Sequence, residues 1–231
     1  MMTLEQSETL SQSEVVVQGI KQMILDGDLA AGQKLPTEKD LAPRLGVSRG
    51  SLREGVRALC SMGVLETRHG AGMYVTSLDP SLLLAPMGFV VDLQHESRAA
   101  DIHAVRRTLE IEAVGRAALR ITDAEIEQAD SILAEAEEAI GRTDHETVIA
   151  CDERFHRLIA NASGNPVLAA LIEAISSRTI TDRMRRATSD EHADLRSAGE
   201  HRAVLAALAS GDPDVARIRM AGHLLDVEHS V

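Results

Sequence analysis

The chain has 231 residues, a formal net charge of −12 and 44% hydrophobic residues, so it is long enough for two domains with separate cores. Aromatic residues make up only 1%, which favours closely packed aliphatic helices. Because there is no apolar run of about 18 residues and the N-terminus is polar, we expect neither a membrane span nor a secretory signal. Cys60 and Cys151 lie in what we predict to be different domains. A disulfide is therefore not expected, and the reducing cytoplasm is the expected location.

Charge is distributed unevenly along the chain. Residues 1–77 contain 8 Lys/Arg and 9 Asp/Glu, whereas the remainder contains 16 and 27. Within the first part, residues 34–68 hold seven basic and four acidic side chains. A basic segment in an acidic protein is typical of DNA contact. We predict a DNA-binding domain over residues 1–77 and a second domain, with another role, over residues 78–231.

The first domain has the pattern of a winged helix-turn-helix. An amphipathic helix is predicted over residues 13–26, followed by two short helices that are joined by a tight turn at Gly46. Thr37 and Ser48 are the predicted N-caps of these two helices, with Asp40 three residues after Thr37. Strands at 64–67 and 73–76 then flank a glycine-rich turn, which predicts a β-hairpin wing.

One face of the second short helix carries arginines, whereas the other face is apolar. Arg49 and Arg53 lie near its N-terminal end and Arg57 lies one turn further on. Arginine in this position can bind a guanine edge with two hydrogen bonds, or hold a phosphate. An amphipathic helix pair from an unrelated protein would show the same local pattern, and that alternative stays open on pattern alone.

After a short linker at 76–80, nearly all of the sequence has helical periodicity and no strand pattern. We place helices at about 80–93, 99–120, 122–141, 144–161, 166–186, 190–210 and 212–228. The fold class is therefore mainly α: an N-terminal winged helix-turn-helix followed by a C-terminal antiparallel α-helical bundle.

Four polar side chains interrupt the apolar stripes of three bundle helices. Asp152 and His156 are four residues apart and project from one side of their helix. His201 and His223 lie on the inward stripes of two later helices. Each residue alone is typical of an ordinary hydrogen-bonded polar group, but a divalent cation would satisfy all four together. Zinc suits this donor set best, with nickel, manganese or iron as alternatives.

Arg106 is a further polar residue on an inward stripe. It either pairs with Glu110, four residues along the same helix, or grips the carboxylate of a bound ligand. A divalent cation with one Asp and three neutral His is net positive, and Arg106 adds to that charge, so the site would attract an organic anion. The remaining histidines are expected at the surface: His95, His103, His145, His192 and His229.

Residues 35–59, LPTEKDLAPRLGVSRGSLREGVRAL, and the wing sequence GAGMYV at 70–75 closely resemble the DNA-binding domain of the GntR family of bacterial transcription regulators. Gly50 departs from the family pattern, which often has a hydroxyl-bearing or larger residue there. The resemblance implies these DNA-contacting residues: Lys39, Ser48, Arg49, Ser51, Arg53, His69 and Gly70.

Residues from about 80 onward resemble the all-helical FCD-type effector domain of the FadR subgroup of that family. The matching motifs are DERFH at 152–156, EHRAVL at 200–205 and GHLL at 222–225. This resemblance implies a divalent metal beside a small carboxylate metabolite, and it favours Arg106 as a residue that binds the effector. It implies these metal ligands: Asp152, His156, His201 and His223.

Taken together, these patterns predict a homodimeric transcription regulator that responds to a ligand. We expect a repressor that a small organic or sugar acid releases from a palindromic operator. One alternative is a mononuclear metal-dependent hydrolase or lyase. The sequence has no H-E-x-x-H motif, however. An enzymatic function would also not explain the DNA-binding pattern, so we do not expect an enzyme. Another alternative is a regulator whose metal is purely structural.

Overall fold

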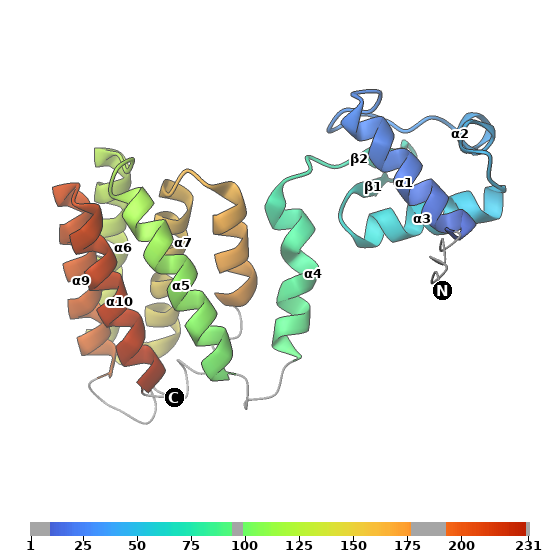
Figure 1. Cartoon of the computed structure of the whole chain (residues 1–231). Helices are drawn as coiled ribbons and strands as arrows, with labels where there is room; N and C mark the ends of the chain where they lie inside the picture. Colours follow the sequence, from blue (N-terminus) through green and yellow to red (C-terminus); the bar gives the residue numbers. More distant parts are fainter. Residues whose placement is uncertain (1–9, 94–98, 177–192, 230–231) are drawn as a thin grey trace, which may run out of the picture. The chain divides into compact units, whose positions relative to one another are not determined.

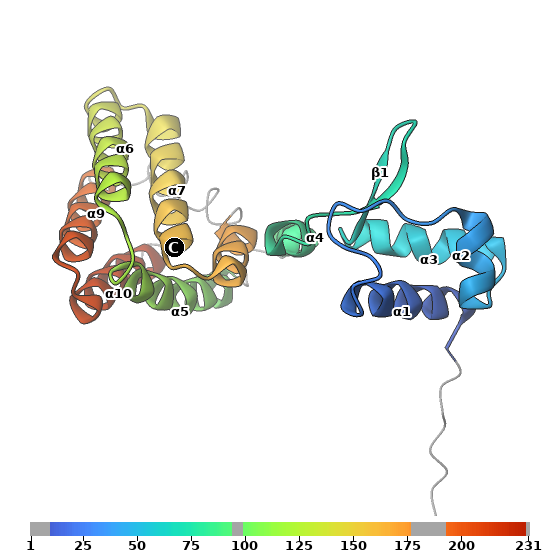
Figure 2. The ribbon, with the colours of Figure 1, turned by 90° about the horizontal axis from the view of Figure 1, so that it is seen from above.

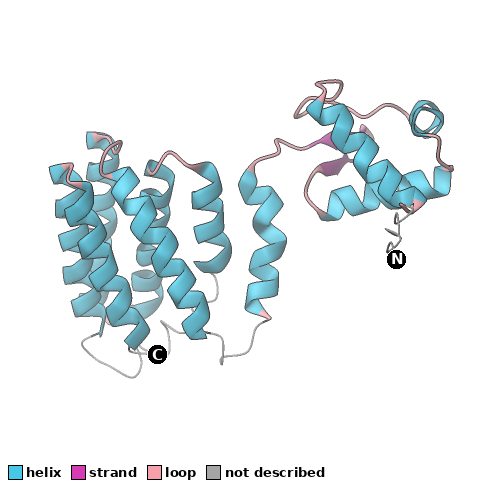
Figure 3. Ribbon diagram, viewed as in Figure 1, coloured by secondary structure: helices cyan, strands magenta, loops and turns pink. Residues whose placement is uncertain are grey.

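The structure, a computed structural model, describes residues 10–93, 99–176 and 193–229. It divides into two compact units, Met1–Leu83 and Leu84–Val231. The described residues are mainly helical and contain one two-stranded sheet, which confirms the predicted fold class (Figure 3). None of the helices in these ranges is long and apolar enough to cross a membrane.

The first unit consists of three helices and a hairpin: α1 (Gln12–Leu25), α2 (Glu38–Leu45), α3 (Arg49–Ser61), β1 (Leu65–Arg68) and β2 (Gly72–Val75). The strands pair antiparallel with Leu65 opposite Val75, and the hairpin extends away from the helices as a wing (Figure 2). Val16 and Ile20 of α1 are fully buried against the other helices and the base of the hairpin. Helix α1 approaches α3 so closely that a Cβ at Gly55 would lie 2.6 Å from the Cβ of Val16.

The turn between α2 and α3 follows the prediction at both of its signals, Gly46 and Ser48. Gly46 ends α2 with a left-handed backbone, φ 68°, and the Ser48 hydroxyl accepts a hydrogen bond from the Ser51 amide at 3.1 Å. Thr37 is the N-cap of α2, as predicted, but its side chain makes no cap hydrogen bond. Thr37 has the extended backbone of an N-cap, but its hydroxyl donates to the Asp40 carboxylate at 2.6 Å instead of accepting from the helix backbone.

The second unit is a helical bundle. Helix α4 (Pro80–Asp92) includes the boundary between the units, and residues 166–176 are helical. The other helices are α5 (Ala99–Ala117), α6 (Asp123–Gly141), α7 (His145–Ala162), α9 (Ala193–Ser210) and α10 (Pro213–His229). These five form a closed ring in which α5 contacts α10, α10 contacts α9, α9 contacts α6, α6 contacts α7, and α7 contacts α5 (Figures 1 and 2).

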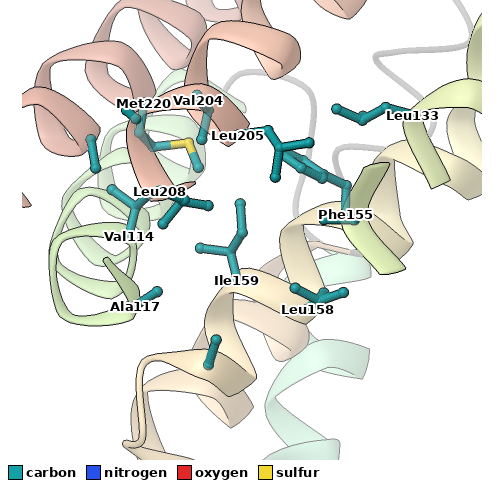
Figure 4. Packing of buried hydrophobic residues seen from close by; sticks show 14 of the residues in the cluster. Val114, Ala117, Leu133, Phe155, Leu158, Ile159, Val204, Leu205, Leu208 and Met220 are labelled. Atoms are coloured by element: carbon teal, nitrogen blue, oxygen red, sulfur yellow. The ribbon is translucent and has the colours of Figure 1, made fainter. Parts of the chain in front are cut away.

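The interior of this ring is filled with aliphatic side chains and one phenylalanine (Figure 4). Phe155 and Ile159 of α7 meet Leu208 of α9 and Met220 of α10 there, each almost completely buried. The ring of Phe155 lies 5.0 Å from that of His201, centroid to centroid. The apolar core therefore adjoins the polar cluster described next, and it shields one side of that cluster from water.

Candidate metal centre and DNA-contact surface

The structure brings together the four residues that the sequence proposed as metal ligands. Asp152 and His156 come from α7, His201 from α9 and His223 from α10. One ligand atom of each lies within 4.8 Å of the others. The Nε2 atom of His201 is 3.3 Å from Nε2 of His156, 3.1 Å from Nε2 of His223 and 3.4 Å from a carboxylate oxygen of Asp152. The three imidazoles thus face one centre.

Two glutamates bond the Nδ1 atoms of two of these imidazoles, on the side of each ring opposite the shared centre. Nδ1 of His156 bonds the Glu110 carboxylate, and Nδ1 of His223 lies 2.7 Å from Oε2 of Glu200. A carboxylate beside Nδ1 favours the tautomer with its proton on that nitrogen, which leaves the lone pair on Nε2 directed at the shared centre. Both imidazoles are therefore oriented in the form that a metal ligand requires.

The protonation state of the buried groups agrees with this arrangement. Burial, together with the neighbouring His201 and His156, holds the pKa of His223 well below its ordinary value, so its imidazole is neutral at pH 7. Burial raises the pKa of Glu110, but the Arg106 guanidinium and His156 outweigh that effect and hold the pKa at about 2. Glu110 is thus an ionised carboxylate inside the bundle, which is the strongest acceptor available to the imidazole it orients.

The donor set of this cluster fits a divalent cation. Three imidazole nitrogens and one carboxylate oxygen are typical ligands of zinc and of nickel, manganese or iron(II). When bound, such a cation supplies a positive centre for the converging lone pairs and balances the Asp152 charge. The chain's own residues supply the geometry of the site, because the surrounding helices and the two glutamates keep the four donors facing one another.

A small cavity adjoins the cluster. It has a volume of about 40 Å³, its walls come from α6, α7 and α9, and Asp152 and His201 are among its lining residues. This volume accommodates one or a few water molecules. Asp194 also lines the cavity, and it bonds Nδ1 of His145 at 2.7 Å across the contact between α9 and α7.

The predicted DNA contacts lie at three places in the first unit. Lys39 is exposed in the first turn of α2, and Arg49 is exposed in the first turn of α3. His69 and Gly70 form the tip of the hairpin, where Gly70 has a φ of 69°. Ser48 and Ser51 bond each other at 2.9 Å at the start of α3.

Arg53 has a partner that the sequence did not indicate. Its Nε and Nη2 each lie 2.9 Å from one carboxylate oxygen of Glu38, in a two-point ion pair that joins α3 to α2. On the wing, the guanidinium of Arg68 stacks over the Tyr74 ring at 4.3 Å from the centroid. Arg68 is therefore a basic side chain of the wing that sequence reasoning did not propose for DNA contact.

Comparison with known protein families finds one match in each of the two units. The profile described as "Bacterial regulatory proteins, gntR family" matches residues 12–75, and the profile "FCD domain" matches residues 101–226. This chain belongs to the GntR family and carries an FCD domain. It is a DNA-binding transcriptional regulator of this type.

The relatives of this GntR protein carry the names of regulators. "HTH-type transcriptional regulator LutR" of Bacillus subtilis is 30% identical over 211 residues, which is 89% of this chain and 94% of LutR. "Putative L-lactate dehydrogenase operon regulatory protein" of Escherichia coli is 30% identical and covers 92% of this chain and 83% of its own length. Among solved structures, "Streptococcus agalactiae GntR" has a TM-score of 0.72 at 27% identity and covers 95% of this chain and 100% of its own.

Arg106 of this GntR protein pairs with Glu110, which is one of the two roles that the sequence left open for it. Its side chain is 1% exposed, and its Nε bonds the Glu110 carboxylate. It is not among the residues that line the small cavity, which lie on α6, α7 and α9. A role for Arg106 in binding an effector stays a prediction.

Sequence reasoning missed both glutamates that orient the imidazoles. Glu110 had one signal, its spacing of four from Arg106, but nothing in the sequence joined it to His156, 46 residues away. Glu200 immediately precedes His201, yet it bonds His223 on the next helix. Pairs formed between helices depend on the packing of the bundle, so local spacing does not reveal them.

The expectation that the other histidines lie at the surface is wrong for His103. It is 5% exposed because it lies three residues before Arg106, on the same inward face of α5. His145 is only half-buried, through its bond with Asp194. His95 and His192 lie outside the described residues, and for His229 only the helical backbone is described.

Proposed function

We propose that this protein is a homodimeric repressor that binds a palindromic operator and is released by a small organic or sugar acid bound beside Asp152, His156, His201 and His223. The observation that carries the proposal is the convergence of three imidazoles, two of them oriented by a glutamate, and one carboxylate inside the unit that accompanies a DNA-binding unit. Zinc is the cation we propose for these donors. The name of the Escherichia coli relative refers to L-lactate, which favours a hydroxy acid.

The acid can change operator binding only through a difference in its affinity for two states of the protein. An organic anion suits the cluster because a divalent cation with one carboxylate and three neutral imidazoles has net positive charge. Arg106 supplies a further positive group one helix away, and its guanidinium would have to exchange part of its bond with Glu110 for the acid. The space now beside the ligands is small, so we expect the helices to move apart when the acid binds.

The test is a screen for release from DNA. The wild-type protein first selects a binding sequence from a pool of duplexes with a randomised centre, and that duplex becomes the operator probe. Hydroxy acids and sugar acids are then added singly to the metal-loaded protein. We expect at least one acid to weaken binding by roughly 5- to 150-fold, the usual range of coupling between two sites. Asp152→Asn should abolish this response and leave operator binding without acid unchanged. If no acid alters operator affinity, the proposed regulation is wrong.

Removal of Arg49 should weaken operator binding strongly. Arg49 is exposed at the start of α3, the helix expected to enter the major groove. Arg49→Ala is expected to cost about 1–3 kcal/mol on the operator probe and to relax specificity at one base position. Fluorescence anisotropy with single-base variants of the probe measures both effects. Arg142→Ala, on the helical unit, is the matched control and should bind as wild type. Unchanged binding after loss of both Arg49 and Arg53 would contradict this docking.

A further inference from the structure

An acidic residue lies among the predicted DNA-contact residues of the first unit. Glu38 is the first residue of α2, next to Lys39, and both of its carboxylate oxygens bond Arg53 of α3. The two side chains remain accessible, with 62% of Arg53 and 46% of Glu38 exposed. A carboxylate at this position repels DNA phosphates, so its presence on a DNA-contact surface needs a reason.

The geometry of the pair supplies one. An arginine has five N–H donors in a rigid plane, and Glu38 takes one from Nε and one from Nη2. The other edge of the guanidinium, formed by Nη1 and Nη2, faces away from Glu38. That edge has the spacing that binds the O6 and N7 atoms of guanine with two hydrogen bonds. Glu38 thus fixes the plane of the guanidinium and leaves one of its base-reading edges available.

We propose that Glu38 is a positioning residue that gives Arg53 its base selectivity. The inference rests on the proposed function, because it requires that Arg53 contacts the operator. Without Glu38, Arg53 would rotate freely and could bind any nearby phosphate, which adds affinity for every sequence and selectivity for none. With Glu38, the pair has no net charge, and Arg53 contributes chiefly where a guanine meets its free edge.

A purely structural ion pair between α2 and α3 is the competing explanation. Exposed ion pairs contribute little to stability, and the loss of such a pair would shift the unfolding temperature slightly without changing which DNA sequence is preferred. The preference for sequence is therefore the measurement that separates the two explanations.

The experiment uses the full-length protein, the operator probe selected by the wild type, and the same duplex with its base pairs shuffled. In Glu38→Gln, we expect tighter binding to the shuffled duplex, a steeper salt dependence by about one ion, and a ratio of operator to shuffled affinity about tenfold lower. Glu54→Gln makes the same change of charge on α3, one residue after Arg53, and should leave that ratio unchanged.

Glu38→Asp separates geometry from charge. It keeps the carboxylate but is one methylene too short for the two-point contact, so we expect selectivity to fall while affinity for the shuffled duplex stays near that of wild type. Arg53→Ala should lower the ratio at least as much. If Arg53→Ala lowers the ratio and both Glu38 variants retain it, the positioning role is overturned while operator reading by Arg53 stands. If Arg53→Ala retains the ratio, both are overturned.

Discussion

Chelation of the proposed metal is expected to lower the unfolding temperature of the protein by roughly 10 °C. A ligand that binds only the folded state adds about 4 kcal/mol when its concentration is 1,000 times its dissociation constant. For a domain of this size, each kcal/mol corresponds to about 2–4 °C. The physical reason is that three imidazole lone pairs and the Asp152 carboxylate, held face to face by the bundle, repel one another once the cation between them is removed. Differential scanning calorimetry before and after chelation, and after addition of Zn²⁺, measures the shift.

Variants of the cluster test whether the shift belongs to these residues. His201→Ala should make the unfolding temperature insensitive to the chelator, whereas His145→Ala, a half-buried histidine of the same bundle outside the cluster, should keep the full shift. Glu200→Gln should weaken metal binding by about 10- to 100-fold, because it removes the carboxylate that orients His223. An unfolding temperature that is the same with and without metal, in the wild type, would contradict a metal centre at this position.

Replacement of Glu110 by alanine should be among the most destabilising single changes in the helical unit. Glu110 and Arg106 are both almost fully buried, and Glu110 also bonds His156. Removal of one partner of a buried ion pair leaves an unbalanced charge in the interior, which costs about 3–5 kcal/mol. Urea unfolding of the chelated protein measures this cost without a contribution from metal binding. Glu138→Gln removes an exposed partner of Arg142 and should cost less than about 0.5 kcal/mol.

The same carboxylate predicts a dependence of stability on pH. The pKa of Glu110 is held at about 2 in the folded protein, below the 4.5 that is usual for glutamate. A lowered pKa means that the folded state favours the ionised form, so this stabilisation is fully present above pH 4.5 and is lost as the pH falls towards 2. The difference in unfolding free energy between wild type and Glu110→Gln should therefore shrink between pH 5 and pH 3. A constant difference over that range would show that the Glu110 charge does not stabilise the fold.

The helical pattern was predictable because helix ends are marked locally. Thr122 and Glu125 form the reciprocal capping pair that begins α6, and proline begins α10 at residue 213. The predicted helix at 144–161 is α7, His145–Ala162, and the predicted winged helix-turn-helix is present in the first unit. These features depend on side chains within a few residues of one another, so the sequence contains the whole signal. The N-cap position of Thr37 was predictable in the same way, but its hydroxyl bonds the Asp40 side chain and makes no cap hydrogen bond to the helix backbone.

The sequence by itself determined the class of the protein: the order of the helices, the hairpin, the basic segment and the four residues that meet at one centre. The inward stripes sufficed to find those four, because helical spacing fixes which side chains face a shared core. The tertiary structure decided which glutamates bond the functional side chains of both units. Glu110 reaches His156, Glu200 reaches His223, and Glu38 reaches Arg53, each on another helix. Such pairs form only when each helix has packed against its neighbour with a particular rotation about its axis and a particular shift along it. The spacing of residues within one helix does not encode that arrangement.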